Sequence, residues 1–149
     1  MGEGTNLGDE RIILHWLDVN HDPERWNYSR ALYAIVHPET DEILYLGKAD
    51  GSTVRQRWNA GDKHERVWCR IERELGVREH VLIVAEFRTS QGLRLTRQLL
   101  ADIEGLLIYS LKPWANRQCV ESRGIKRPGM VVFCQGHWPI RKKTFRDQC

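Results

Sequence analysis

The stretch ALYAIVHPETDEILYLGKA, residues 31–49, decides the fold class because it has the pattern of a β-hairpin. Its two apolar runs, residues 32–36 and 43–47, are rich in residue types that favour strands. Between them lies HPETDE, a polar segment with the proline and acidic residues that are common in turns. The sequence therefore predicts two antiparallel strands joined by a turn.

Outward from the hairpin, the chain predicts an α+β fold in which helices flank a small antiparallel sheet of three core strands. The third core strand is the apolar run at 81–87 (VLIVAEF). Further strands are predicted toward either end of the chain, at 11–19 and 130–134. Residues 50–53 (DGST) predict a turn and an N-cap, from which a short helix runs through Trp58. Helical spacing predicts two longer helices, 64–75 and 93–111.

The bulk composition is that of one globular domain. A chain of 149 residues is the usual size of a single domain and buries a core without disulfide staples. No stretch reaches the ~18 apolar residues of a membrane span, and the N-terminus lacks the pattern of a secretory signal. We therefore expect a cytoplasmic (intracellular) protein with no membrane partner, in which the four cysteines are free thiols.

Basic residues gather toward the C-terminus, although the net charge is only +3. The segment after residue 116 has only two acidic residues, Glu121 and Asp147. Its basic residues are Arg117, Arg123, Lys126, Arg127, Arg141, Lys142, Lys143 and Arg146. Such a tail either contacts phosphates or only keeps the protein soluble, and charge alone does not decide between the two.

One acidic residue interrupts the apolar face of the longest predicted helix. At ~100° per residue, Leu100, Leu107 and Ile108 fall on one arc, and Glu104 falls near its middle. A carboxylate in that place needs a cation or strong hydrogen-bond donors, because burying it unpaired is very costly. Glu104 therefore either lines a cleft at the edge of the core or forms a structural salt bridge, with Arg97 or with a residue elsewhere.

The hairpin carries one tyrosine on each strand. Tyr33 shares a face with Ile35, and Tyr45 shares a face with Gly47, because side chains alternate along a strand. Gly47 lets another group approach the backbone closely. Taken alone, two such tyrosines are usually packing residues.

The hairpin motifs resemble those that name the GIY-YIG nuclease family. Residues 31–33 (ALY) stand where the first motif is expected, with alanine for the usual glycine and leucine in the middle position. Residues 45–47 (YLG) differ from the second motif only by leucine for isoleucine. The longer tract 45–49 (YLGKA) is close to the form found in the excision-repair members of the family.

Three further elements of the resemblance follow in family order. Arg57, within VRQRW, matches an arginine on the next helix, and Glu104, within IEGLLI, matches a metal-binding glutamate. Asn116 ends KPWAN, which is similar to a Pro-x-x-Asn element. His64 is a candidate for the histidine of some members, although it comes later than the common spacing. The resemblance covers residues 31–116.

The resemblance implies a GIY-YIG-like fold and a divalent-metal-dependent endonuclease that hydrolyses phosphodiester bonds in DNA. It assigns the role of general base to Tyr33, and it makes Glu104 the ligand of a single Mg²⁺ (or Mn²⁺) ion. Arg57 would clamp the scissile phosphate with its planar fork. Tyr45 would hydrogen-bond a phosphate oxygen or the attacking water.

Supporting roles follow from the same resemblance. Because a free tyrosine titrates near ~10, Tyr33 needs a cation or hydrogen bond nearby, which Lys48, Arg57 or His64 would supply. The residues expected to shape the backbone near the site are Gly47 and Asn116. Those expected to contact DNA are Arg55, Arg57, Lys126, Arg127, Arg141, Lys142 and Lys143.

We expect one domain over residues 1–149, with a motif core at 31–116, an N-terminal extension at 1–30 and a basic C-terminal extension at 117–149. Members of the family usually add a DNA-recognition domain, and these flanks are too short for one. Recognition would then come from the extensions, a homo-oligomer or a separate specificity partner. A restriction, repair or mobile-element role fits the sequence equally well.

Two other hypotheses compete with the nuclease. One is a non-catalytic nucleic-acid-binding module on the same fold, although binding alone needs no buried carboxylate. The other is an unrelated α+β protein in which Glu104 is structural. The nuclease hypothesis requires Tyr33, Tyr45, Arg57 and Glu104 to converge on one cleft, with Tyr33 and Glu104 on the same side of the sheet.

Overall fold

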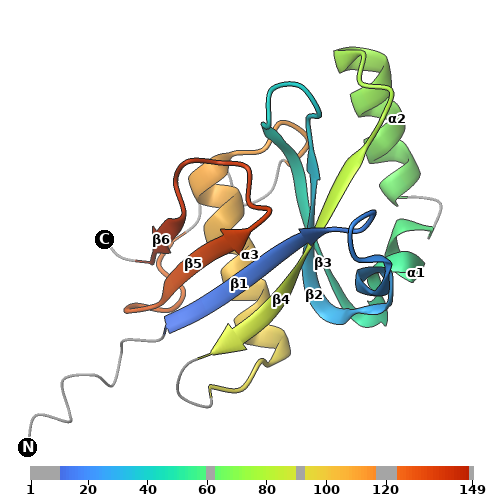
Figure 1. Ribbon diagram of the computed structural model, residues 1–149. Helices are drawn as coiled ribbons and strands as arrows, with labels where there is room; N and C mark the ends of the chain where they lie inside the picture. The colour runs from blue at the N-terminus through green and yellow to red at the C-terminus, as the bar shows by residue number, and fades with distance from the viewer. Residues whose placement is uncertain (1–10, 60–62, 90–92, 117–123, 148–149) are drawn as a thin grey trace, which may run out of the picture.

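A six-stranded sheet forms the centre of the computed structural model, which describes residues 11–59, 63–89, 93–116 and 124–147. The strand order is β3-β2-β4-β1-β5-β6 (Figure 1). Neighbouring strands are antiparallel except β1 and β5, which run parallel. The strands are β1 (Arg11–Asp18), β2 (Ser29–Val36), β3 (Ile43–Thr53), β4 (Val81–Thr89), β5 (Val131–Gly136) and β6 (Thr144–Arg146).

The α+β class is confirmed, but the sheet is larger than its predicted three-stranded core and is mixed rather than antiparallel. The predicted hairpin and third strand are β2, β3 and β4, which are neighbours. The predicted terminal strands are β1 and β5, and β6 was not predicted. The parallel pair arises because β1 lies between β4 and β5, a contact between distant segments that no local pattern reveals.

Side-chain caps determine where the helices begin. Thr53 and Gln56 form a reciprocal capping box at the start of α1. The last helix begins at Arg97 rather than at the predicted residue 93, because the Thr96 side chain accepts a hydrogen bond from the Leu99 amide. The helices are η2 (Pro23–Asn27), a 3₁₀ helix, and α1 (Val54–Trp58), α2 (Lys63–Leu75) and α3 (Arg97–Leu111).

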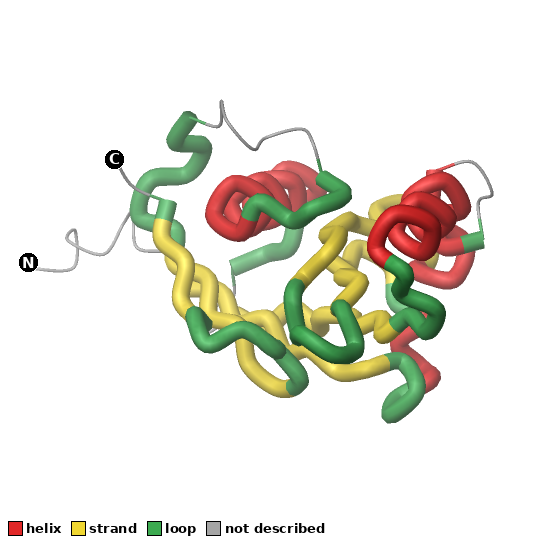
Figure 2. The backbone as a smooth tube through the Cα atoms, turned by 90° about the horizontal axis from the view of Figure 1, so that it is seen from above, coloured by secondary structure: helices red, strands yellow, loops and turns green. Residues whose placement is uncertain are grey.

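The two faces of the sheet carry different helices. Leu32 and Ala34 of β2 belong to the core beneath α3, whereas Tyr33 and Ile35, which alternate with them, pack in a second core with residues of α1 and α2 such as Val54. Figure 1 shows α3 (orange) on one side and α1 and α2 (green) on the other, and the same separation is visible from above in Figure 2. Within the described residues, no helix is long and apolar enough to cross a membrane.

The described part of the C-terminal extension belongs to the sheet and is not a solvated tail. Phe145 on β6 is 1 % exposed and packs in the core beneath α3. The Asp147 carboxylate accepts hydrogen bonds from the backbone amides of Lys126 and Arg127. Similarly, β1 brings the N-terminal extension into the centre of the sheet. Both extensions therefore contribute to the fold that supports residues 31–116.

Candidate active site

The two motif tyrosines meet above Gly47. Tyr33 on β2 and Tyr45 on β3 have ring centroids 6.3 Å apart, and their side chains hydrogen-bond to each other. They are 1 % and 7 % exposed, respectively. A Cβ atom on Gly47 would lie 2.7 Å from the Tyr33 hydroxyl oxygen and 3.0 Å from the Tyr45 ring. Gly47 therefore provides the space in which the Tyr33 phenol lies across β3.

We expect Gly47→Ala to lower the free energy of unfolding by about 1–3 kcal/mol, the usual cost of overpacking a core. The new methyl group would displace the buried, rigid Tyr33 ring. Chemical denaturation measures the effect, and Gly124→Ala is the matched control because a Cβ there meets nothing within 4 Å. Equal midpoints for Gly47→Ala and the wild-type protein would show that the tyrosine pair has room to move.

Glu104 forms an ion pair with Lys48. The Lys48 ammonium donates to the Glu104 carboxylate at 3.3 Å, and the two side chains are 35 % and 15 % exposed. The suggested salt bridge between Glu104 and Arg97 is not the one found, because Arg97 pairs with Asp50 at 2.8 Å. Lys48, expected to assist Tyr33, is therefore held by the carboxylate on α3.

Tyr33 and Glu104 come from opposite faces of the sheet, so the expectation of a shared face is wrong. Tyr33 packs with α1 and α2, and the buried apolar residues of α3 all lie in the other core. However, β3 is an edge strand, and both groups reach consecutive residues of it. The Tyr33 hydroxyl lies over Gly47, and the Glu104 carboxylate contacts Lys48. The two faces meet at this edge.

The four predicted catalytic groups interact electrostatically across that edge. Burial raises the pKa of Tyr33 far above its ordinary value, and the charges of Tyr45 and Glu104 raise it further, while Arg57 lowers it. Burial and the charge of Glu104 likewise raise the pKa of Tyr45, whereas the hydrogen bond from Tyr33 and the charge of Arg57 lower it. Arg57 supplies the expected cation, but burial outweighs it. Both phenols are therefore protonated at neutral pH.

The other residues expected near the tyrosines have different surroundings. Arg57 is half-buried on α1, whereas Arg55 is exposed and stacks on the Trp26 ring at 5.4 Å from its centroid. His64 lies within α2, but its side chain is outside the described residues. Lys48 and Arg57 are the two proposed cations whose side chains the structure describes, and of these two the charge of Arg57 lowers the pKa of Tyr33.

Asn116 pairs with the free edge of β3. Its side-chain amide accepts a hydrogen bond from the Leu46 amide and donates one to the Leu46 carbonyl, both at 2.8 Å. The Ala115 amide donates to the Leu44 carbonyl at 2.7 Å. The segment after α3 thus replaces a neighbouring strand and covers the edge beside Tyr45.

The C-terminal basic residues lie elsewhere. Arg127 forms an ion pair with the buried Asp102 on α3 at 3.1 Å, so its role is at least partly structural. The ammonium group of Lys142 lies 5.1 Å from the centroid of the Phe145 ring. Lys126, Arg141 and Lys143 are exposed. Residues 141–143 precede β6, at the opposite edge of the sheet from β3, so the structure does not bring them to the tyrosines.

The donor groups suit an ion that is shared with a phosphate. No cluster of three or more His, Cys, Asp or Glu side chains that could hold a metal occurs in the part of the chain that the structure describes. Mg²⁺ often keeps several waters and uses one or two carboxylates together with substrate phosphates. The partly exposed Glu104 fits that mode of binding, provided that Lys48 moves aside.

Comparisons of the chain with protein-family models, with curated proteins and with solved structures found no match.

Proposed function

We propose that the protein is a divalent-metal-dependent DNA endonuclease that hydrolyses phosphodiester bonds, with Tyr33 as general base and Glu104 as metal ligand. Tyr33 and α3, the helix that carries Glu104, pack on opposite faces of the sheet, which counts against a shared cleft, so the mechanism requires the two groups to act across the edge strand β3. The observation that supports the proposal is the electrostatic coupling of Tyr33, Tyr45, Arg57 and Glu104 across that edge. A purely structural tyrosine pair needs neither a nearby guanidinium nor a nearby carboxylate. Action on DNA inside the cell also agrees with the free thiol groups of Cys69 and Cys134.

Each group has a distinct task in this mechanism. Arg57 neutralises the scissile phosphate, so that a water molecule can approach the anion. Tyr33, as phenolate, accepts the proton of that water, and the Tyr45 hydroxyl hydrogen-bonds a phosphate oxygen or the water. Glu104 would hold the Mg²⁺ or Mn²⁺ ion, which supplies Lewis acidity for the departing oxygen when it is bound.

The pH dependence of cleavage tests this mechanism. Because the pKa of Tyr33 is raised, its phenolate fraction grows about tenfold per pH unit throughout the working range. We therefore expect plasmid nicking in Mg²⁺ to accelerate with pH, without a plateau below about pH 10, the ordinary pKa of tyrosine. EDTA should stop nicking at every pH. A rate that levels off near neutral pH contradicts the assignment of Tyr33 as the base.

The Lys48–Glu104 ion pair favours a second candidate, a non-catalytic nucleic-acid-binding module. In that case the ammonium already satisfies the carboxylate, and no metal is required. The two candidates differ in one assay. A non-catalytic binding module would shift the mobility of DNA in a gel at every Mg²⁺ concentration and would never nick it.

Binding of DNA at the β6 edge is a separate part of the proposal. Truncation at Arg141 would remove β6 and the buried Phe145, so charge is better tested by substitution. We expect joint replacement of Arg141, Lys142 and Lys143 by glutamine to lower the salt dependence of DNA binding by up to about three units, roughly one per phosphate contact. Cleavage should persist. An unchanged salt dependence means that these side chains are only solvated.

Recognition of a target sequence is assigned to a partner. The described parts of both extensions are used to build the sheet, which leaves them little freedom to form a recognition module. We propose that a homo-oligomer or a separate specificity subunit supplies it. Sedimentation of the protein alone and with DNA separates these two arrangements.

A further inference from the structure

A half-buried aspartate, Asp50, forms ion pairs with two arginines near the end of β3. The Asp50 side chain is 9 % exposed, and each of its two carboxylate oxygens pairs with one arginine. One accepts a hydrogen bond from Nε of Arg30 at 3.0 Å, and the other accepts one from Nε of Arg97 at 2.8 Å. Two guanidinium groups against one carboxylate leave a net positive charge. We call these three residues the arginine clasp.

Both arginines keep most of their hydrogen-bonding capacity. They bind Asp50 through Nε, and Arg30 makes one further, longer bond, from Nη1 to the Leu95 carbonyl at 3.4 Å. Their side chains are 46 % and 78 % exposed. Among the residues that the structure describes, Asp50 is the acidic partner of both. The terminal guanidinium nitrogens are thus available to an anion from outside.

The backbone at Arg30 is held in an uncommon conformation. Its φ angle is 49°, a left-handed value that a residue with a side chain adopts only at a cost, and the pairing of β2 with β3 shifts register between Ser29 and Ala31. Such a bulge redirects the side chain at its centre. Here the redirected side chain is that of Arg30, which reaches toward the start of α3.

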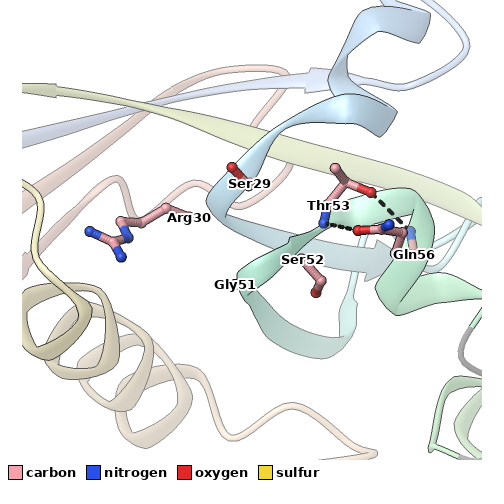
Figure 3. A pocket seen from close by; sticks show the side chains of 6 residues that line it. All are labelled: Ser29, Arg30, Gly51, Ser52, Thr53 and Gln56. Carbon is pink, nitrogen blue, oxygen red and sulfur yellow. Dashed lines mark hydrogen bonds between the residues drawn. The ribbon is translucent and has the colours of Figure 1, made fainter.

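A polar pocket adjoins Arg30 (Figure 3). Its volume is about 580 Å³, within the range of small-molecule binding sites. Arg30 extends to one side of the pocket, and Ser52, Thr53 and Gln56 stand on the other. Thr53 and Gln56 are occupied by the capping box, whereas the Ser29 and Ser52 hydroxyls make no hydrogen bond within the described residues. The pocket therefore presents spare donors beside a cation.

The clasp lies close to the candidate active site along two elements. On β3, Asp50 is two residues beyond Lys48, about 6.6 Å at the usual rise of a strand. On α3, Arg97 is two turns before Glu104, about 10.5 Å along the axis. These spacings correspond to roughly two to three nucleotides, since one strand of DNA rises about 3.4 Å per nucleotide.

We propose that Arg30 and Arg97, positioned by Asp50, bind a backbone phosphate of the DNA strand two to three nucleotides from the scissile phosphate, and that the adjoining nucleotide enters the pocket beside Arg30. This inference rests on the proposed function, because it names where the substrate of that site continues. The chemistry recognised is a phosphodiester, for which paired guanidinium forks are well suited. Asp50 is a positioning residue.

The first test measures DNA binding in EDTA, where no cleavage occurs. We expect Arg30→Gln with Arg97→Gln to lower the slope of log K against log salt by about one unit, the contribution of one phosphate. The matched control is Arg73→Gln with Arg88→Gln, which removes two exposed, ion-paired arginines elsewhere and should leave the slope unchanged. Equal slopes for the two double variants overturn the inference.

The second test uses Asp50→Asn, which removes a negative charge and keeps the shape of the side chain. Charge alone predicts tighter binding of DNA by this variant. If Asp50 positions the arginines, binding instead weakens, while circular dichroism shows an intact fold. Tighter binding, or a lowered melting temperature with unaltered binding, makes Asp50 a merely structural link between β3 and α3 and overturns the positioning role.

Two further readouts separate the sources of failure. Inorganic phosphate, added at the same concentration as the phosphate groups of a bound short oligonucleotide, should not displace that oligonucleotide from the protein. If it does, the clasp is a site for free phosphate instead. Hydrolysis of bis(4-nitrophenyl) phosphate, which is too small to reach the clasp, should be the same in the Arg30/Arg97 variant and the wild-type protein. A wild-type protein that binds DNA through the clasp but never hydrolyses a phosphodiester refutes the proposed nuclease and not the clasp.

Discussion

Glu104→Gln is expected to abolish Mg²⁺-dependent cleavage and to leave the fold almost as stable as that of the wild-type protein. The substitution keeps the size of the side chain and removes the charge that would hold the metal. Lewis-acid stabilisation is worth several kcal/mol, and each 1.36 kcal/mol is a factor of ten in rate, so the loss should reach about 10³-fold or more. Plasmid nicking with and without Mg²⁺ measures it.

The structure also determines what should happen to stability. A fully buried ion pair that loses one partner costs about 3–5 kcal/mol, because the other charge is left without compensation. Lys48 is 35 % exposed and can turn to water, so the pair should contribute only about 0–1 kcal/mol. We therefore expect the melting temperature of the variant to stay near that of the wild-type protein.

A matched control for this variant lies on α2. Glu74 forms an ion pair with Arg70 at 3.1 Å, and Glu74→Gln removes the same kind of group from a pair without a catalytic role. This control should retain both activity and stability. A Glu104→Gln protein that melts several degrees lower and still nicks DNA would falsify the metal-ligand role and leave Glu104 with a structural one.

Tyr33→Phe is expected to lower the single-turnover rate of cleavage by about 10²- to 10⁴-fold, the usual contribution of a general base. DNA affinity should be unchanged, because Tyr33 is buried and only 1 % exposed. The ring remains in place over Gly47. The comparison of rate and affinity therefore separates chemistry from binding.

Tyr109→Phe controls for the removal of a tyrosine hydroxyl, since Tyr109 is 40 % exposed on the outer side of α3. The Tyr33 variant also loses its hydrogen bond with Tyr45, which should reduce the free energy of unfolding by about 0.5–1.5 kcal/mol. Unchanged single-turnover cleavage by Tyr33→Phe transfers the role of base to His64 or to a metal-bound hydroxide.

The hairpin and the helices are the parts of the fold that the sequence predicted well. Alternation along the strands and the spacing of apolar residues are local signals, and β2, β3, β4, α1 and α2 follow them closely. The sheet beyond these elements was harder to predict. The position of β1 between β4 and β5 depends on contacts between segments that are far apart in the chain.

The same limit applies to the candidate site. The position of Glu104 on an apolar face predicted a partner, but its partner could not be named, because Lys48 becomes a neighbour only when α3 packs beside β3. The relative placement of Tyr33 and Glu104 was wrong for a related reason. Two segments can each have the expected local structure and still lie on opposite faces of one sheet.

Asp50 was missed because it was interpreted as part of a turn. The strand β3 continues to Thr53 instead, which brings the Asp50 side chain toward α3. Arg30 gave no signal at all, since a left-handed conformation of an arginine has no sequence signature. The nearest usable sign was an acidic residue two positions after Lys48, at the spacing that places both side chains on one face of a strand.

The position of β1 also has a consequence for the order in which the protein folds. His15 on β1 and Gln135 on β5 are 120 residues apart in sequence and contact each other in the sheet. During synthesis, the earliest strand must therefore wait for almost the last one, and closure of so long a loop precedes any gain from the pairing. The β2–β3 hairpin can form long before. A ribosome-bound chain that ends before β5 would expose one side of β1, and that unpaired edge is where a chaperone or a neighbouring nascent chain would compete with the native partner.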